Sequence, residues 1–149
     1  MNKTIEAPYK NGKILRRFGV GITLTGFLIF LLGADPNMFG LDRTDVIGFV
    51  QIMVFLSGLG ALCLGGLILY QVSWAGIQKT IPAEIGLRLV ATGYVIALAS
   101  GMADVFGLGT RPLPNVPFFG YWQARGVLLG EIVIMIGFAL MIPFVRRSE

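Results

Sequence analysis

The chain has 149 residues, of which 55% are hydrophobic and only 13% are charged. This composition excludes an ordinary soluble globular protein, in which about a quarter of the residues are charged. The net charge of +4 is typical of membrane topology and contact with anionic lipid in so apolar a chain, and it argues against nucleic-acid binding.

The residue types that usually hold metals and redox cofactors are nearly missing. The sequence contains no histidine and a single cysteine, Cys63. One thiol can form neither an internal disulfide nor an iron–sulfur cluster, and histidine is the commonest ligand of haem iron, zinc and copper. We therefore expect no metal and no cofactor, although a bound lipid is compatible with the composition.

Four long apolar stretches predict four transmembrane helices. Each is close to or above the ~20 residues that a helix needs to cross ~30 Å of hydrocarbon. Helices are favoured over a membrane barrel because the stretches lack strict two-residue alternation. The sequence thus predicts an all-α integral membrane fold, with residues 1–149 as a single transmembrane domain. The stretches run over about 15–34, 46–72, 85–103 and 119–145.

Basic residues predict the orientation of these helices. Five Lys or Arg precede the first apolar stretch, Lys79 lies between the second and third, and Arg146 and Arg147 end the chain. The loops after the first and third stretches each carry a single basic residue, Arg43 and Arg111 respectively. By the positive-inside rule, both short termini are predicted to be cytoplasmic in a multi-pass protein, with the first helix kept as an anchor.

The chain contains an internal repeat. Residues 25–41 read TGFLIFLLGADPNMFGL and residues 92–108 read TGYVIALASGMADVFGL. The likeness continues in the second helix of each copy, where 48–51 (GFVQ) matches 120–123 (GYWQ). The repeats cover about 16–72 and 83–145. Because a two-helix unit returns the chain to its starting side, the sequence predicts two tandem helical hairpins of the same orientation.

Small residues recur every seven positions in all four predicted helices. This spacing keeps one face of a helix turned towards a partner, and glycine there lets the two backbones approach closely. The alternative is that glycine is simply common in membrane helices, but the shared period of the two copies argues against it. The predicted helix-packing residues are Gly19, Gly26, Gly33, Gly58, Gly65, Gly86, Gly93, Ser100, Gly130 and Gly137.

The repeated Phe-Gly-Leu tripeptides lie where the first and third helices leave the membrane, at 39–41 and 106–108. We expect the glycine to end each helix. The flanking Phe and Leu are expected to form a hydrophobic plug over the end of the hairpin.

The second repeat has gained ionisable residues inside the membrane, and such residues mark function or pairing. Arg88, Asp104, Arg125 and Glu131 occupy the positions that Gly21, Asn37, Met53 and Leu59 hold in the first repeat. Both repeats also carry a glutamine just inside the membrane, where its amide is expected to bond across helices. The candidate functional residues are Glu131, Arg88, Arg125, Asp104, Gln51 and Gln123.

Glu131 is the strongest of these candidates because it is expected near the middle of the membrane, about 16 Å along its helix. Three hypotheses compete for it. Glu131 pairs with Arg88 or with a partner protein; it stays protonated, since burial disfavours the charged form; or it lines a polar pathway. Asp104 and Arg125 are expected to pair near the membrane boundary, and Glu84 competes for Arg88 one turn away.

The sequence contains no catalytic constellation: no nucleophile–base pair, no phosphate-binding glycine loop and no metal-ligand cluster. The leading hypothesis is a non-catalytic accessory or structural subunit of a larger integral-membrane complex, which packs against other integral-membrane subunits or against itself. The alternative is a small homo-oligomeric transporter or channel that uses Glu131 together with Gln51 and Gln123.

Overall fold

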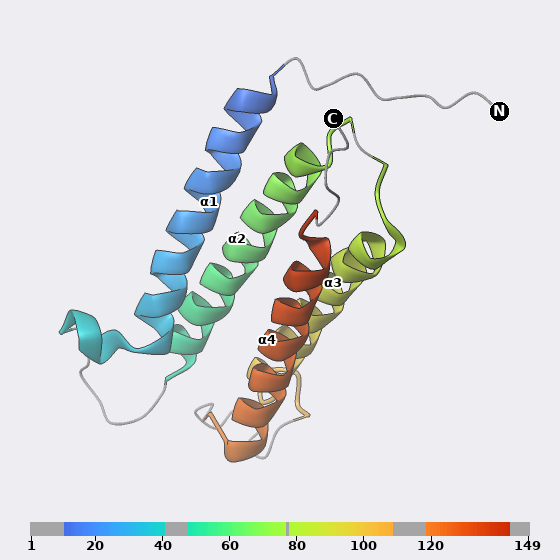
Figure 1. Cartoon of the computed structure of the whole chain (residues 1–149). Helices are drawn as coiled ribbons and strands as arrows, with labels where there is room; N and C mark the ends of the chain where they lie inside the picture. The colour runs from blue at the N-terminus through green and yellow to red at the C-terminus, as the bar shows by residue number, and fades with distance from the viewer. Residues whose placement is uncertain (1–10, 41–47, 77, 109–118, 144–149) are drawn as a thin grey trace.

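The computed structural model describes residues 11–40, 48–76, 78–108 and 119–143, and it is helical throughout this part of the chain. All four α-helices are long and apolar enough to span a membrane, which confirms the predicted fold class and indicates a multi-pass membrane protein. The segments 1–10 and 144–149, predicted to be cytoplasmic, lie outside the described residues. The elements are α1 (Gly12–Ala34), the short 3₁₀ helix η1 (Pro36–Phe39), α2 (Phe49–Ser73), α3 (Ile81–Gly101) and α4 (Tyr121–Met141) (Figure 1).

Proline explains the two largest differences from the predicted boundaries. α3 begins at Ile81 rather than near 85, because Pro82 fits the first turn of a helix, where no backbone N–H is needed. α4 ends at Met141 rather than near 145. Ile142 is extended (φ −67°, ψ 126°), as expected for a residue that precedes proline, here Pro143.

The helices pair as two tandem hairpins, α1 with α2 and α3 with α4. Figure 1 shows that both hairpins close at the same end of the molecule, whereas α2 joins α3 at the opposite end. We call these the turn end, where residues 35–48 and 102–120 close the hairpins, and the connector end, where residues 74–80 join them. The two repeats therefore have the same orientation.

Glycine lies at each close approach within the hairpins. A Cβ atom placed on Gly26 of α1 would lie 2.5 Å from the backbone nitrogen of Leu62 on α2. In the second hairpin the contact is reciprocal: a Cβ on Gly93 would lie 2.6 Å from the carbonyl oxygen of Gly130, and a Cβ on Gly130 would lie 2.6 Å from that of Gly93. No larger residue fits these points unless the helices move apart.

The rest of the seven-residue stripe occupies the same two seams. Ser100 is partly buried, and its hydroxyl lies against Gly126 of α4. The other stripe residues are buried and face the neighbouring helix of their own hairpin: Gly19, Gly26, Gly33, Gly58, Gly65, Gly86, Gly93, Gly130 and Gly137.

The two hairpins meet through α2, which packs against both α3 and α4. If the repeats were related by an exact two-fold axis, the α2–α3 contact would have an equivalent between α4 and α1. Among the described residues, however, α1 contacts α2 and η1 but neither α3 nor α4. The four-helix arrangement is therefore open on the side between α1 and α4.

The repeats differ at one pair of positions where α2 meets α3. On α2, Gly60 leaves space for the Tyr94 ring of α3, whose hydroxyl donates to the carbonyl oxygen of Leu56 at 3.4 Å. The equivalent residues are Ile132 on α4 and Phe27 on α1, and they remain 41% and 45% exposed. A branched side chain in place of glycine prevents the second aromatic ring from approaching in the same way.

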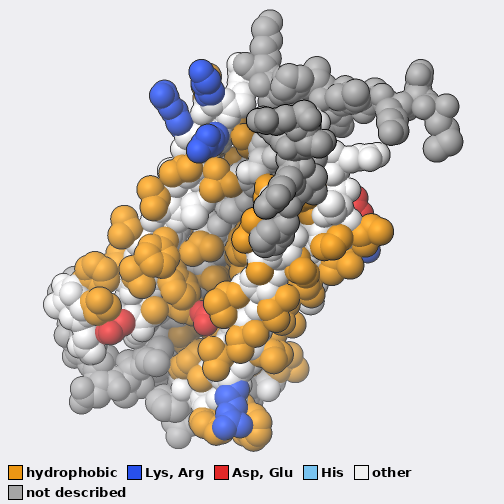
Figure 2. Space-filling model, viewed as in Figure 1, with side chains coloured by type: hydrophobic (Ala, Val, Ile, Leu, Met, Phe, Trp, Pro, Cys, Tyr) orange, Lys and Arg blue, Asp and Glu red, His pale blue; other side chains and the backbone are white. Residues whose placement is uncertain are grey.

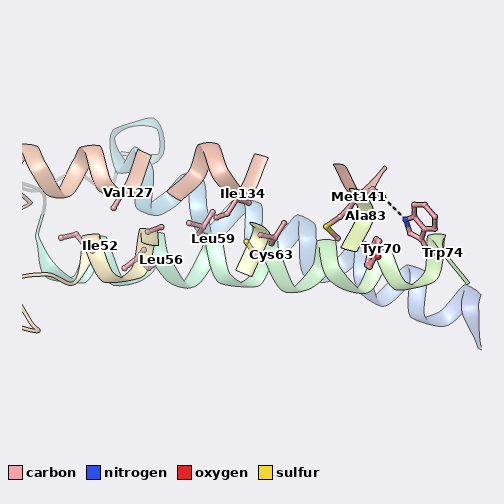
Figure 3. Close-up of a cluster of buried hydrophobic side chains, with 12 residues drawn as sticks. Ile52, Leu56, Leu59, Cys63, Tyr70, Trp74, Ala83, Val127, Ile134 and Met141 are labelled. Carbon is pink, nitrogen blue, oxygen red and sulfur yellow. Dashed lines mark hydrogen bonds between the residues drawn. The ribbon is translucent and has the colours of Figure 1, made fainter. Parts of the chain in front are cut away.

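The hairpins are joined most firmly near the connector end. Gly66 of α2 lies against Phe138 of α4, which holds the equivalent position in the second repeat. The indole Nε1 of buried Trp74 donates to the carbonyl oxygen of Met141 at 2.9 Å (Figure 3). A cluster of buried apolar side chains from α2, α3 and α4 fills the centre of the molecule.

The glycines of the repeated tripeptides do not end the first and third helices as expected, because α1 ends at Ala34 and α3 ends at Gly101. Gly40 (φ 64°) instead caps η1, and Gly107 (φ 74°) lies at the end of the turn that follows α3. The predicted hydrophobic plug is wrong for the residues that the structure describes, because Phe39, Phe106 and Leu108 are 45%, 59% and 82% exposed. Leu41 lies outside the described residues. The side chains of Phe39, Phe106 and Leu108 project outwards rather than packing over the hairpin ends.

Gly26→Ala is expected to destabilise the protein, because its Cβ would meet the backbone of α2 rather than a side chain that can rotate away. Overpacking of this kind costs ~1–3 kcal/mol. The matched control is Gly21→Ala on the same helix, where a Cβ would meet nothing within 4 Å. Thermal unfolding in detergent measures both variants. Equal unfolding temperatures for the two variants would contradict the packing role of the stripe.

Trp74→Phe is expected to lower the unfolding temperature by a few degrees, because it leaves the carbonyl of Met141 without its indole donor. Loss of such a hydrogen bond corresponds to about 1 kcal/mol. Trp122→Phe serves as the control, since Trp122 is 74% exposed. The same thermal measurement applies, and an unchanged Trp74→Phe variant would show that this bond does not hold the hairpins together.

Candidate functional site

A cavity of about 400 Å³ lies where the contact between α1 and α4 is missing. Three helices contribute to it: the last turns of α1, the first turns of α2 and the first half of α4. It therefore lies on the turn-end side of the molecule, between the two hairpins. The lining residues are Phe30, Gly33, Ala34, Gln51, Ile52, Phe55, Phe119, Ala124, Val127, Leu128 and Glu131.

Among the described residues that line this cavity, Glu131 is the only ionisable one. It is half-buried, and ten residues separate it from each end of α4, so it lies about 15 Å from either end of the helix. Its equivalent in the first repeat, Leu59, is buried in the core. Leu59 is more buried than Glu131 because α2 is central in the molecule, whereas α4 borders the open side.

Aromatic side chains form much of the apolar wall. The rings of Phe30 on α1 and Phe55 on α2 lie with their centroids 4.9 Å apart and their planes at 38°. Phe119, just before α4, completes the aromatic set at the turn end of the cavity. The cavity thus combines one carboxyl group with three phenyl rings.

Gln51 occupies the turn end of the cavity and links the two helices of its own hairpin. Its Nε2 donates to the carbonyl oxygen of Gly33 at 3.0 Å, across the α1–α2 seam. Gln123, the equivalent residue, acts differently. Its Oε1 accepts from the backbone N–H of Gly120 at 2.7 Å, so it caps its own helix, and the expectation of a bond across helices is wrong for Gln123.

The hypothesis that Glu131 pairs with Arg88 is not supported by the geometry. Gly86 of α3 faces α4, and Arg88, two residues later, projects about 200° away from that face. The Arg88 side chain is exposed on the outer side of α3. Helical spacing from the stripe residue Gly86 to Arg88 already argues against this pairing in the sequence.

Asp104 and Arg125 lie near the turn end, where Arg125 contacts aromatic rings. Asp104 is buried in the turn after α3, at 3% exposure. Arg125 is exposed, and its guanidinium lies 4.2 Å from the ring centroid of Tyr121 and 5.8 Å from that of Trp122. A cation over these rings is favourable at a membrane boundary, where aromatic belts lie.

The outer face of α3 is a second feature of interest, and it was missed in the sequence because the apolar pattern hides it. Small and polar residues lie exposed along this face, opposite the seam with α4. From Arg88 to Ala99 only Val95 is a bulky apolar residue exposed on α3, whereas α4 exposes several, such as Leu129, Ile132 and Met135. Nearer the connector end, Ile81 and Ile85 of α3 are also exposed. We call the α3 feature the outer stripe; it consists of Arg88, Ala91, Thr92, Val95 and Ala99.

Figure 2 shows that the described residues present a mostly hydrophobic surface on the side in view. Two surfaces of the molecule differ from this background. One is the cavity with its mid-membrane carboxyl group, and the other is the outer stripe of α3. Among the described residues no cluster of His, Cys, Asp or Glu could hold a metal ion. Comparison with known protein families, with curated proteins and with solved structures finds no match to this chain.

Proposed function

We propose that this protein is a non-catalytic accessory subunit of a larger integral-membrane complex. The observation that carries this proposal is the outer stripe of α3. In lipid, helix interfaces are enriched in small residues that permit close backbone approach, and polar side chains bond across them. Ala91 and Ala99 are small and Thr92 adds a hydroxyl to the same exposed face. Val95, between them, is a larger apolar side chain that is 60% exposed.

Arg88 strengthens this argument. It lies seven residues after the start of α3 at Ile81, about 10 Å from the connector end of the helix. An ionic group at that depth is unfavourable against lipid unless it reaches the interface or meets a polar partner. A partner helix packed along the outer stripe would supply such a contact, because its backbone could approach the small residues next to Arg88.

The orientation in the membrane is part of the same proposal. The first turns of α1, which lie at the connector end, carry three basic residues: Lys13, Arg16 and Arg17. Lys79 lies at the same end of the molecule. Figure 2 shows basic side chains gathered at that end of α1. We place the connector end and both termini on the cytoplasmic side, following the positive-inside rule.

A small homo-oligomeric transporter or channel is the second candidate, and the cavity beside Glu131 favours it. Gln51 lines the same cavity, which agrees with a polar pathway. Gln123 supports it less, because its amide oxygen is bonded to the start of its own helix. The glycine seams also leave little space for a pore within either hairpin.

Ala91→Phe is expected to weaken association with the partner subunits about tenfold or more, because a ring on the outer stripe would hold a docked helix away. The measurement is native mass analysis after gentle extraction from native membranes. Ala139→Phe is the matched control, since Ala139 is exposed on α4 outside the outer stripe.

The wild-type protein is expected to extract together with other gene products. A pure homo-oligomer or a lone monomer from native membranes would contradict the accessory role, and the homo-oligomer would favour the second candidate. Equal recovery of partners with Ala91→Phe and Ala139→Phe would remove the outer stripe from the interface.

A further inference from the structure

The cavity beside Glu131 has the size and chemistry of a binding site for a small molecule. Its volume of about 400 Å³ falls within the ~300–1,000 Å³ that is usual for such sites. The space that one water molecule occupies in the liquid is only ~30 Å³, so the cavity is much more than a packing defect. An apolar wall with a few convergent polar groups is the usual composition of a ligand pocket.

The lining specifies a positively charged ligand. Glu131 supplies a carboxyl group, and none of the described lining residues is Lys or Arg. Phe30, Phe55 and Phe119 present phenyl rings in the same cavity. Aromatic faces attract cations, and the attraction increases when the site excludes water. A carboxylate in the same cavity as several phenyl rings thus matches an organic cation in both charge and apolar surface.

The position of the cavity specifies a lipophilic ligand. Glu131 lies midway along α4, about 15 Å from either end, so the site lies at the depth of the hydrocarbon. The described parts of α1 and α4 do not contact each other, which leaves the cavity accessible from the side. A molecule that partitions into the bilayer can therefore enter between these two helices.

We propose that this cavity binds a lipophilic organic cation, with the positive group against Glu131 and the apolar body against Phe30, Phe55 and Val127. The site is separate from the outer stripe, which lies on the opposite side of α3 from α4. Ligand binding in the cavity goes beyond the accessory role and does not depend on it, because an occupied cavity leaves the outer face of α3 free.

The test uses the full-length protein in nanodiscs of zwitterionic phosphatidylcholine, with tetraphenylphosphonium as the probe. Equilibrium dialysis measures binding above that of empty nanodiscs, and tetraphenylsilane serves as the uncharged competitor of similar shape. Wild-type protein is expected to bind the cation saturably, with little displacement by the silane.

Glu131→Gln is expected to weaken binding by about tenfold or more, in line with the loss of a contact to a charged group. Glu84→Gln is the control, because it removes the same charge from an exposed position on α3 outside the cavity. Ala34→Trp fills the cavity while keeping the carboxyl group, and it is also expected to lose binding. Ala139→Trp, outside the cavity, is expected to bind as wild type does.

Thermal unfolding of each variant establishes that it is folded before binding is compared. Glu131→Asp keeps the charge and is expected to bind more tightly than Glu131→Gln. The proposal is overturned if wild type binds no more than empty nanodiscs, if Glu131→Gln binds as tightly as Glu84→Gln, or if the silane displaces the cation fully. Recovery of partner subunits with Glu131→Gln tests the accessory role separately, since that variant leaves the outer stripe intact.

Discussion

Close backbone approach at glycine is the interaction on which the rest of this structure depends. Within lipid there is no hydrophobic drive to bring two apolar helices together, so packing contacts and interhelical hydrogen bonds must do it. The seams meet this need because Gly93 and Gly130 each present no side chain to the other. The close seam also lets the Nε2 of Gln51 reach the carbonyl oxygen of Gly33. Each hairpin is therefore a rigid unit in its own right.

The relation between the two hairpins is less symmetric than their sequences. α2 occupies the centre, where Gly60 admits the Tyr94 ring and Gly66 admits the Phe138 ring. α4 presents Ile132 where α2 has Gly60, and no contact with α1 forms among the described residues. The cavity is the consequence of that asymmetry.

Arg125, Arg88 and Glu131 have separate surroundings. Arg125 lies over the aromatic rings at the start of α4, Arg88 faces outwards from α3, and Glu131 borders the cavity. Ionic groups at membrane depth are costly, and their separation means that each needs its own compensation. This argues for one surface that meets a protein partner and another that meets a small ligand.

The sequence by itself determined the four helices, their tandem pairing and the seven-residue stripes, because hydrocarbon thickness and helical period act locally along the chain. It also singled out Glu131, since a carboxylate in an apolar stretch is visible without coordinates. Only the tertiary structure decided that Gln123 caps its own helix and that α1 stays apart from α4. These outcomes depend on how each helix is rotated about its axis and on the size of side chains from distant parts of the chain, which no local pattern records.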